Sequence, residues 1–328
     1  MILAGLGAYS PREQRPSQAL DIVFGQPSGW TEAQFGIASR GVAAPDETTS
    51  MMGAEAAKRA LAMADWRPGD IDVLIGACGV MEQPIPGASV LIQEALGLGQ
   101  SGIRAFDVNQ TCLSFAAALD VVAMGFAAGR FRRALIVSSD IASCGLDWDT
   151  PASAAIFGDG AAAICVEAGD DPDGPGLLAR GFETYGAGKD LASVRSGGTR
   201  VRLADGLEAF ADGARFRMDP FGIFKAASRT LPALIDRVLG EAGLTRESVD
   251  VIVGHQASRP AIEHARRLMG GDPDRVIDIF ATRGNQIAAS LPTVLVEAHA
   301  AGRLGPGKTV LLLGTAAGIS LAAMVLRT

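Results

Sequence analysis

Residues 106–120 have the sequence F-D-V-N-Q-T-C-L-S-F-A-A-A-L-D, in which a single cysteine stands between a short apolar segment and a helix-like segment. A short apolar segment leads into a polar elbow, which is followed by small and apolar residues with helical periodicity. Asn109 and Thr111 are suitable N-cap residues, so the sequence predicts Cys112 at, or one residue inside, a helix N-terminus. The helix dipole there would lower the pKa of the thiol and favour a nucleophilic thiolate, which suits acyl transfer through a thioester. A small, buried and unreactive cysteine is an equally good interpretation of this stretch alone.

The composition excludes several classes of protein. The chain has 328 residues, of which 48% are hydrophobic and 20% charged, as is typical of a buried α/β sheet protein. A net charge of −7 argues against a nucleic-acid partner. The cysteines show no metal-ligand spacing, which predicts free thiols in a reduced, cytoplasmic protein. Glycines interrupt the apolar run at 309–326, so we expect two buried strands there rather than a membrane helix.

Two blocks of the first half recur, in the same order, in the second half. Residues 64–76, A-D-W-R-P-G-D-I-D-V-L-I-G, are matched by residues 242–254, A-G-L-T-R-E-S-V-D-V-I-V-G. The tetrapeptide A-A-G-R at 127–130 returns at 300–303, each time ahead of an apolar strand. Duplication explains two blocks in the same order better than chance does.

The repeat predicts which distant residues meet. The first block places His255 opposite Ala77 at the exit of a strand, and the second places Asn285 opposite Cys112. We expect two halves packed as a pseudo-two-fold sandwich of sheets, with helices between and outside them. Cys112, His255 and Asn285 would then converge. The halves would be residues 1–169, with the nucleophile, and 176–328, with the histidine and asparagine, separated by the Asp-, Gly- and Pro-rich residues 170–176.

Taken singly, these residues have plainer interpretations. His255 alone is more often a histidine satisfied by backbone hydrogen bonds, and Asn285 alone a turn or cap residue. No second ligand follows at a metal-like spacing, so a metal site is not expected.

Several motifs together resemble one known family. They are D-V-N-Q-T-C ending at Cys112, F-G-D-G-A-A-A at 157–163, G-H-Q-A at 254–257, G-N-Q-I-A-A-S-L-P at 284–292, and an N-terminal signature within residues 36–48. In this order they resemble the ketoacyl-acyl-carrier-protein synthase III branch of the thiolase superfamily, over nearly the whole chain. The resemblance implies an α/β thiolase-like fold with five αβαβα layers and pseudo-two-fold halves, and a homodimer joined through the sheets.

The resemblance also implies a mechanism. Cys112 would take an acyl group from an acyl-CoA or acyl-carrier-protein thioester. His255 and Asn285 would hydrogen-bond the carbonyl oxygen of a malonyl thioester as carbon dioxide leaves. The carbanion would attack the acyl group on Cys112, with the oxyanion held by the N–H groups of Cys112 and Ala317. The β-ketoacyl product would form without a metal or redox cofactor.

Further roles follow from the family's positions. The implied substrate-binding residues are Trp30, Ile85, Ile156, Phe157, Phe224, Ala257 and Arg259. The implied basic rim for an acidic carrier protein consists of Lys225, Arg259, Arg266 and Arg267, for which a solvated surface is the alternative. Gln34 and Pro151 stand where housekeeping members have arginines that clamp the CoA nucleotide. Ile85 lies where the family has a bulky aromatic that reaches into the partner's acyl pocket, and this smaller residue predicts an acyl group longer than acetyl.

Two rival functions stay open on the sequence. The thiol could pass its acyl group to an alcohol or amine, or perform a non-decarboxylative condensation. The chain could also be a catalytically idle subunit that pairs with a true synthase.

Overall fold

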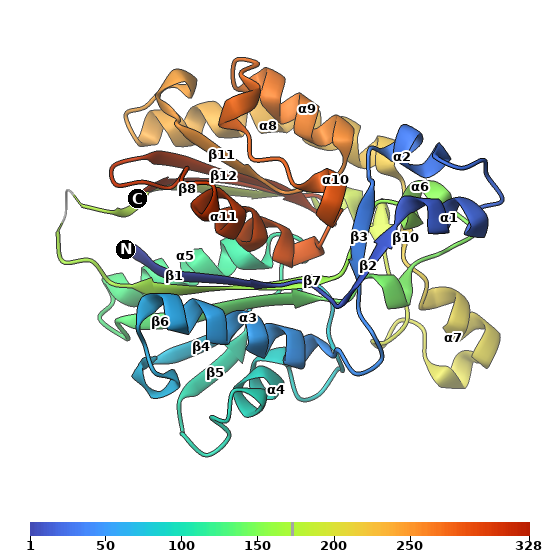
Figure 1. Cartoon of the computed structure of the whole chain (residues 1–328), viewed down its shortest axis with the longest axis horizontal. Helices are drawn as coiled ribbons and strands as arrows, with labels where there is room; N and C mark the ends of the chain where they lie inside the picture. The colour runs from blue at the N-terminus through green and yellow to red at the C-terminus, as the bar shows by residue number, and fades with distance from the viewer. Residues whose placement is uncertain (172–173) are drawn as a thin grey trace.

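The computed structural model describes residues 1–171 and 174–328, and it is organised around two large sheets (Figure 1). The expected boundary at residues 170–176 includes residues 172–173, which lie outside the described residues. Strands from residues 2–167 form the first sheet, and strands from residues 176–327 form the second.

The first sheet has the strand order β1-β7-β6-β4-β5. Strands β5, β4 and β6 are parallel, whereas β7 is antiparallel to both of its neighbours. The bounds are Ile2–Tyr9 (β1), Val73–Gly76 (β4), Arg104–Asp107 (β5), Arg133–Asp140 (β6) and Gly160–Glu167 (β7).

The second sheet repeats this topology, with the order β11-β12-β13-β8. Strands β11 and β12 are parallel, and β13 is antiparallel to both of its neighbours, as β7 is in the first sheet. The place of β5 is taken by a bridge between Ile252 and Val276. The bounds are Gly176–Thr184 (β8), Val251–Gly254 (β11), Thr309–Ala316 (β12) and Ser320–Arg327 (β13). Strands β12 and β13 confirm the hairpin predicted from the glycine-interrupted apolar run.

Helices form the other layers. Helices α5 (Ser114–Ala127) and α11 (Ser290–Ala300) lie between the sheets (Figure 1). Helices α3 (Thr49–Ala64) and α4 (Ala88–Ala95) cover the outer face of the first sheet. Helices α8 (Pro220–Glu241) and α9 (Arg259–Leu268) cover the outer face of the second. This αβαβα order confirms the predicted thiolase-like fold.

The central core explains why this arrangement is stable. Side chains of α5 and α11 meet the inner faces of both sheets in one apolar cluster. Phe115 and Leu119 of α5 and Leu291 of α11 are almost fully buried there. Each such side chain contributes roughly 1.5–3 kcal/mol relative to an exposed position.

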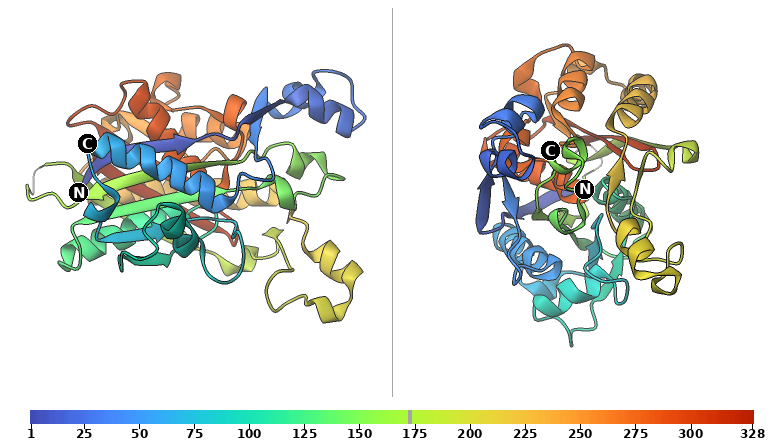
Figure 2. Two further views of the ribbon diagram at one scale, coloured as in Figure 1. Left: turned by 60° about the horizontal axis from the view of Figure 1, so that its bottom comes forward. Right: turned by 90° about the vertical axis from the view of Figure 1, so that its right-hand side faces the viewer.

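The remaining elements lie at one end of the molecule or connect the layers. Residues 181–217 begin inside β8 and then run through helix α7, which projects from the layered body (Figure 2). Pro232 lies inside α8, which continues without interruption from Pro220 to Glu241. The other bounds are Glu13–Pro16 (β2), Ser39–Val42 (β3), Ala192–Ser193 (β9), Arg217–Met218 (β10), Ser17–Val23 (α1), Trp30–Phe35 (α2), Pro151–Ala154 (α6), Leu207–Gly213 (α7) and Phe280–Arg283 (α10). Across the described residues, no helix combines the length and apolarity that crossing a bilayer requires.

Candidate active site

Cys112 lies in a tight elbow between β5 and α5. Helix α5 begins at Ser114 with Leu113 as its N-cap, so Cys112 lies one residue before the cap, whereas the sequence predicted it at the helix N-terminus or one residue inside. Thr111 adopts a positive φ of 48°. Its N–H donates to Oδ1 of Asn109 (2.9 Å), and the N–H of Gln110 donates to Oγ of Ser114 (2.9 Å). Asn109 and Thr111 therefore shape the elbow rather than cap the helix.

The electrostatics of Cys112 also differ from the sequence prediction. Burial raises the pKa of its thiol to about 12, and the carboxylate of Asp140 adds to this rise. The predicted lowering by the helix dipole is wrong, because desolvation of the thiolate outweighs it at this position. Cys112 is therefore a protonated thiol at neutral pH.

His255 follows the last residue of β11 and is nearly buried. Its backbone N–H donates to the carbonyl oxygen of Leu313 (2.8 Å), as the N–H of Ala77 donates to Val137 (2.7 Å) in the first half. This equivalence confirms the predicted pairing of His255 with Ala77. Burial lowers the pKa of the imidazole to about 4, so the ring is neutral at neutral pH.

Asn285 is held with its amide nitrogen free for a ligand. Its Oδ1 accepts a hydrogen bond from the N–H of Ile287 (2.9 Å), which leaves Nδ2 as the donor that can face a substrate. Its backbone N–H donates to Ile156 (2.8 Å), and the N–H of Gly158 donates to its carbonyl oxygen (3.1 Å). A Cβ on Gly158 would lie 2.2 Å from the carbonyl oxygen of Arg283, so only glycine permits this contact. The F-G-D-G motif thus serves to seat the Asn285 turn.

The two elbows of the molecule are equivalent, but in a register different from the predicted one. The N–H of Gln286 donates to Oγ of Ser290 (3.0 Å), and Ile287 has a positive φ of 54°. These two features, and the bond from the N–H of Ile287 to Oδ1 of Asn285, match three features of the Cys112 elbow. The matching features are the bond from Gln110 to Ser114, the positive φ of Thr111 and the bond from Thr111 to Asn109. Asn285 therefore corresponds to Asn109 rather than to Cys112, and the prediction that paired it with the cysteine is wrong.

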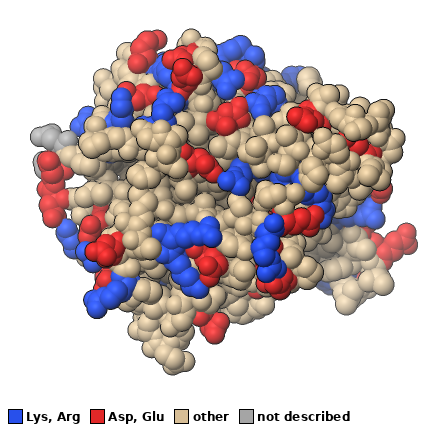
Figure 3. Space-filling view, viewed as in Figure 1, with Lys and Arg blue, Asp and Glu red and all other residues tan. Residues whose placement is uncertain are grey.

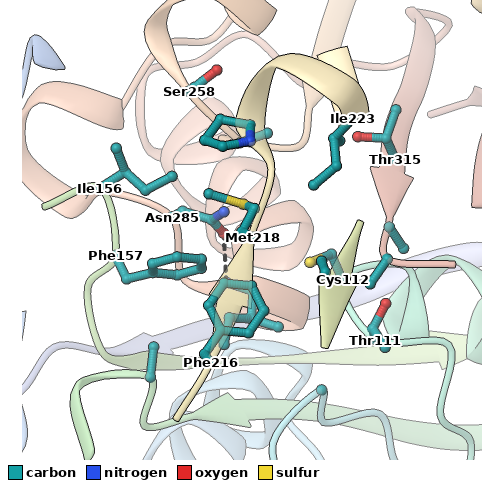
Figure 4. A pocket seen from close by; sticks show the side chains of 18 of the residues that line it. Thr111, Cys112, Ile156, Phe157, Phe216, Met218, Ile223, Ser258, Asn285 and Thr315 are labelled. Carbon is teal, nitrogen blue, oxygen red and sulfur yellow. Dashed lines mark hydrogen bonds between the residues drawn. The ribbon is translucent and has the colours of Figure 1, made fainter. Parts of the chain in front are cut away.

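The structure brings most of the predicted site residues to one cavity of about 730 Å³. Figure 4 shows Cys112 on one side of this cavity and Asn285 with Phe157 on the other. The predicted residues that line it are Cys112, His255, Asn285, Ile156, Phe157, Phe224, Ala257 and Ala317. Most of the wall is apolar, so the cavity suits a substrate with a hydrocarbon portion.

Trp30 and Ile85 do not line this cavity. Trp30 packs edge-on against Phe24 and Phe35, with ring centroids 6.4 and 5.6 Å apart. Ile85 is 86% exposed, in the loop between β4 and α4. Their predicted substrate contacts stay predictions.

Two of the four predicted docking cations are already paired. Arg259 forms an ion pair with Asp278, lies over the ring of Phe280 and does not line the cavity. Arg266 pairs with Glu263 (2.6 Å) and with Asp278 (3.5 Å). Lys225 and Arg267 are exposed. In Figure 3, basic and acidic side chains are interspersed over the face shown, without a broad field of one sign.

Much of the cavity wall was not predicted. It includes Ile141, Leu146, Phe216, Met218, Ile223 and Leu231. In α8 the lining positions 220, 223, 224, 227, 228 and 231 follow helical spacing, a signal that is present in the sequence. Phe216 and Met218 come from the irregular segment between β8 and α8, where the sequence has no periodicity that predicts the path of the chain.

Within residues 1–171 and 174–328, no group of three or more His, Cys, Asp or Glu side chains is placed to hold a metal ion.

Comparisons with known proteins place the chain in a family. The model for 3-oxoacyl-[acyl-carrier-protein (ACP)] synthase III matches residues 106–186, and the model for its C terminal matches residues 239–328. A β-ketoacyl-[acyl-carrier-protein] synthase III of Chelativorans sp. (strain BNC1) is 33% identical over 327 residues, which is 98% of each chain.

Solved structures agree with this placement. The 3-oxoacyl-(acyl carrier protein) synthase III of Pseudomonas aeruginosa PAO1 has a TM-score of 0.89 and 28% identity, over 99% of this chain and 97% of that one. The priming β-ketosynthase from the R1128 polyketide biosynthetic pathway has a TM-score of 0.88 and 27% identity, over 99% of this chain and 95% of that one.

The fold and these relatives define a thiolase-fold acyltransferase of the condensing type. Within that class, the chain belongs to the β-ketoacyl-[acyl-carrier-protein] synthase III family, as the sequence motifs indicated.

Proposed function

We propose that the protein performs a decarboxylative Claisen condensation in which Cys112 carries the acyl group and a malonyl thioester supplies two carbons. The observation that supports this most directly is that Cys112, His255 and Asn285, from three separate segments, line one cavity. The acyl donor would be an acyl-CoA or an acyl-carrier-protein thioester, in keeping with the names of the relatives.

Acylation comes first in the proposed sequence. The sulfur of Cys112 attacks the donor's carbonyl carbon, the new C–S bond forms, and the donor's C–S bond breaks. Because the pKa of Cys112 is about 12, a base must take the thiol proton as the bond forms. The departing thiolate is the natural acceptor and would take that proton through water in the cavity, because His255, with a pKa of about 4, is too weak a base to hold it. The N–H groups of Cys112 and Ala317 would hold the oxyanion.

Condensation follows with a malonyl thioester in the same cavity. The bond between its carboxylate carbon and methylene carbon breaks, carbon dioxide leaves, and the electron pair moves into an enolate. Neutral His255 and Nδ2 of Asn285 would donate hydrogen bonds to the enolate oxygen. The methylene carbon then attacks the acyl carbonyl on Cys112, the C–S bond breaks, and the Cys112 thiolate that leaves takes a proton from water. These steps require neither a metal nor a redox cofactor.

The cavity's volume and apolar wall support an acyl group longer than acetyl. The exposed Ile85 would lie against a second copy of the chain in a homodimer and bound that copy's acyl pocket. Lys225 and Arg267 would provide the basic contacts for an acidic carrier protein, because Arg259 and Arg266 are engaged in ion pairs. The free cysteines support a cytoplasmic location.

Intact-mass measurement with a panel of acyl-CoAs of increasing chain length tests this proposal. We expect an acyl adduct on the wild type and none on Cys112→Ala, with medium chains preferred to acetyl. Malonyl-CoA should then release the adduct as a β-ketoacyl product. An ester or amide product would indicate simple acyl transfer, and an absent adduct with every donor would contradict the proposal.

A further inference from the structure

A buried carboxylate, Asp140, lies where the segments of the active site meet. It is the last residue of β6, and its side chain is fully buried. Its Oδ1 accepts hydrogen bonds from the successive N–H groups of Gly79 and Val80, both 2.7 Å. Its Oδ2 accepts from the N–H of Ala289 (3.1 Å). Successive backbone N–H groups directed at one oxygen form an anion-binding nest, here filled by a side chain of the protein itself.

These donors belong to two segments that border the reacting groups. Gly79 lies three residues after the end of β4 and packs so closely that a Cβ there would lie 2.4 Å from Cγ2 of Ile287. The same Cβ would lie 3.3 Å from the backbone of Thr111, next to Cys112. Ala289 ends the turn that begins at Asn285. Asp140 therefore joins the first half's loop to the second half's asparagine turn, beside the elbow that holds the thiol.

We propose that Asp140 is a positioning residue for the condensation, whose ionised carboxylate ties the Gly79–Val80 loop to the Asn285 turn and so fixes Asn285 relative to Cys112. This inference rests on the proposed function. A carboxylate can accept all of these bonds at once, whereas a protonated or amide side chain would turn a donor toward one of the N–H groups. The link therefore depends on the charge of Asp140.

The same dependence gives the proposal a pH signature. Burial raises the pKa of Asp140 to about 7, so the link weakens as pH falls through neutrality. The charge of Asp140 helps to raise the pKa of two thiols, Cys78 in the loop after β4 and Cys112 in the elbow. Both values lie far above 7. His255 has a pKa of about 4, so an acid limb near pH 7 belongs to Asp140 rather than to these groups.

The test compares Asp140→Asn with Asp72→Asn, using an acyl-CoA, malonyl-CoA and the whole protein. Asp72 is a matched control, since one of its oxygens also accepts two successive N–H groups, those of Arg132 (2.8 Å) and Arg133 (2.9 Å). It lies on the surface just before β4, at the end of the strand opposite the active site. We expect Asp140→Asn to lower kcat about 100-fold with little change in KM, because small displacements of catalytic groups have effects of that size. The wild type and Asp72→Asn should lose activity as pH falls from 8 to 6, and the residual activity of Asp140→Asn should not.

A second measurement separates positioning from collapse of the cavity. Alkylation of Cys112 by iodoacetamide, followed by intact mass, should be no slower in Asp140→Asn than in the wild type. Slower alkylation with slower turnover would mean that the cavity had collapsed, and it would overturn the proposal. A wild-type kcat and acid limb in Asp140→Asn would overturn it as well.

If Asp140→Asn does not fold, Asp140→Glu should restore the fold and the acid limb, and a wild type without an acid limb between pH 6 and 8 refutes the inference by itself. A wild type that forms no β-ketoacyl product at any pH would instead refute the proposed function.

Discussion

The buried imidazole of His255 should make the protein lose stability in acid. Burial lowers its pKa from 6.5 to about 4 in the folded chain, whereas the unfolded chain exposes the ring to water. Between these values the unfolded state binds a proton that the native state excludes, so the free energy of unfolding falls as pH falls. The contribution is fully present above pH 6.5 and fully lost below pH 4.

The magnitude follows from the difference between the two pKa values. A shift from 6.5 to about 4 corresponds to roughly 3 kcal/mol of unfolding free energy. Asp140 acts in the opposite sense, because its native pKa of about 7 lets the folded state bind a proton before the unfolded state does. The total pH dependence of the wild type therefore mixes several groups, and a variant is needed to isolate His255.

The assay is urea denaturation of the wild type and of His255→Gln at pH 7.5, 6.0, 5.0 and 4.0. Glutamine keeps a polar side chain of similar length and does not titrate. We expect the difference between the two free energies of unfolding to change by roughly 3 kcal/mol in favour of the variant between pH 7.5 and pH 4. Parallel curves over that range would refute the reasoning from burial.

Two further perturbations follow from particular contacts. Gly158→Ala places a Cβ 2.2 Å from the carbonyl oxygen of Arg283 and should destabilise the fold by about 1–3 kcal/mol while slowing condensation. Gly240→Ala, at an exposed and unobstructed position of α8, is the control and should not destabilise in the same urea titration. Lys225→Glu should raise KM for a malonyl carrier protein at low salt and leave KM for malonyl-CoA unchanged; an equal effect on both would count against carrier docking at this residue.

The elements and their order could be predicted because they depend on local patterns. Thr48 is of a residue type that favours helix N-caps, and its side chain accepts the N–H of Met51 (3.2 Å) at the start of α3. The hairpin of β12 and β13 followed from an apolar run with glycines at its centre. The motifs at the exits of strands and the starts of helices then identified the family, and the resemblance to the family predicted the fold.

The environment of the site could not be predicted in the same way. The pKa of Cys112 depends on burial by segments far away in the sequence and on Asp140, which no motif singled out. The positive φ of Thr111 places a β-branched residue where glycine is usual, so composition gave no warning of the tight elbow. Phe216 and Met218 reach the cavity from an irregular segment, and only tertiary packing puts them there.

The corrected register of the repeat explains how one ancestral turn could serve two roles. In both elbows an asparagine Oδ1 accepts the N–H two residues later, and a serine Oγ accepts the N–H of the residue after the asparagine. The shared feature is thus a rigid turn, and neither a thiol nor an amide donor defines it. In the second half the asparagine that shapes the turn lines the cavity, whereas in the first half a cysteine three residues further on does so. Duplication therefore supplied matched scaffolds, and the reactive groups occupy different positions on them.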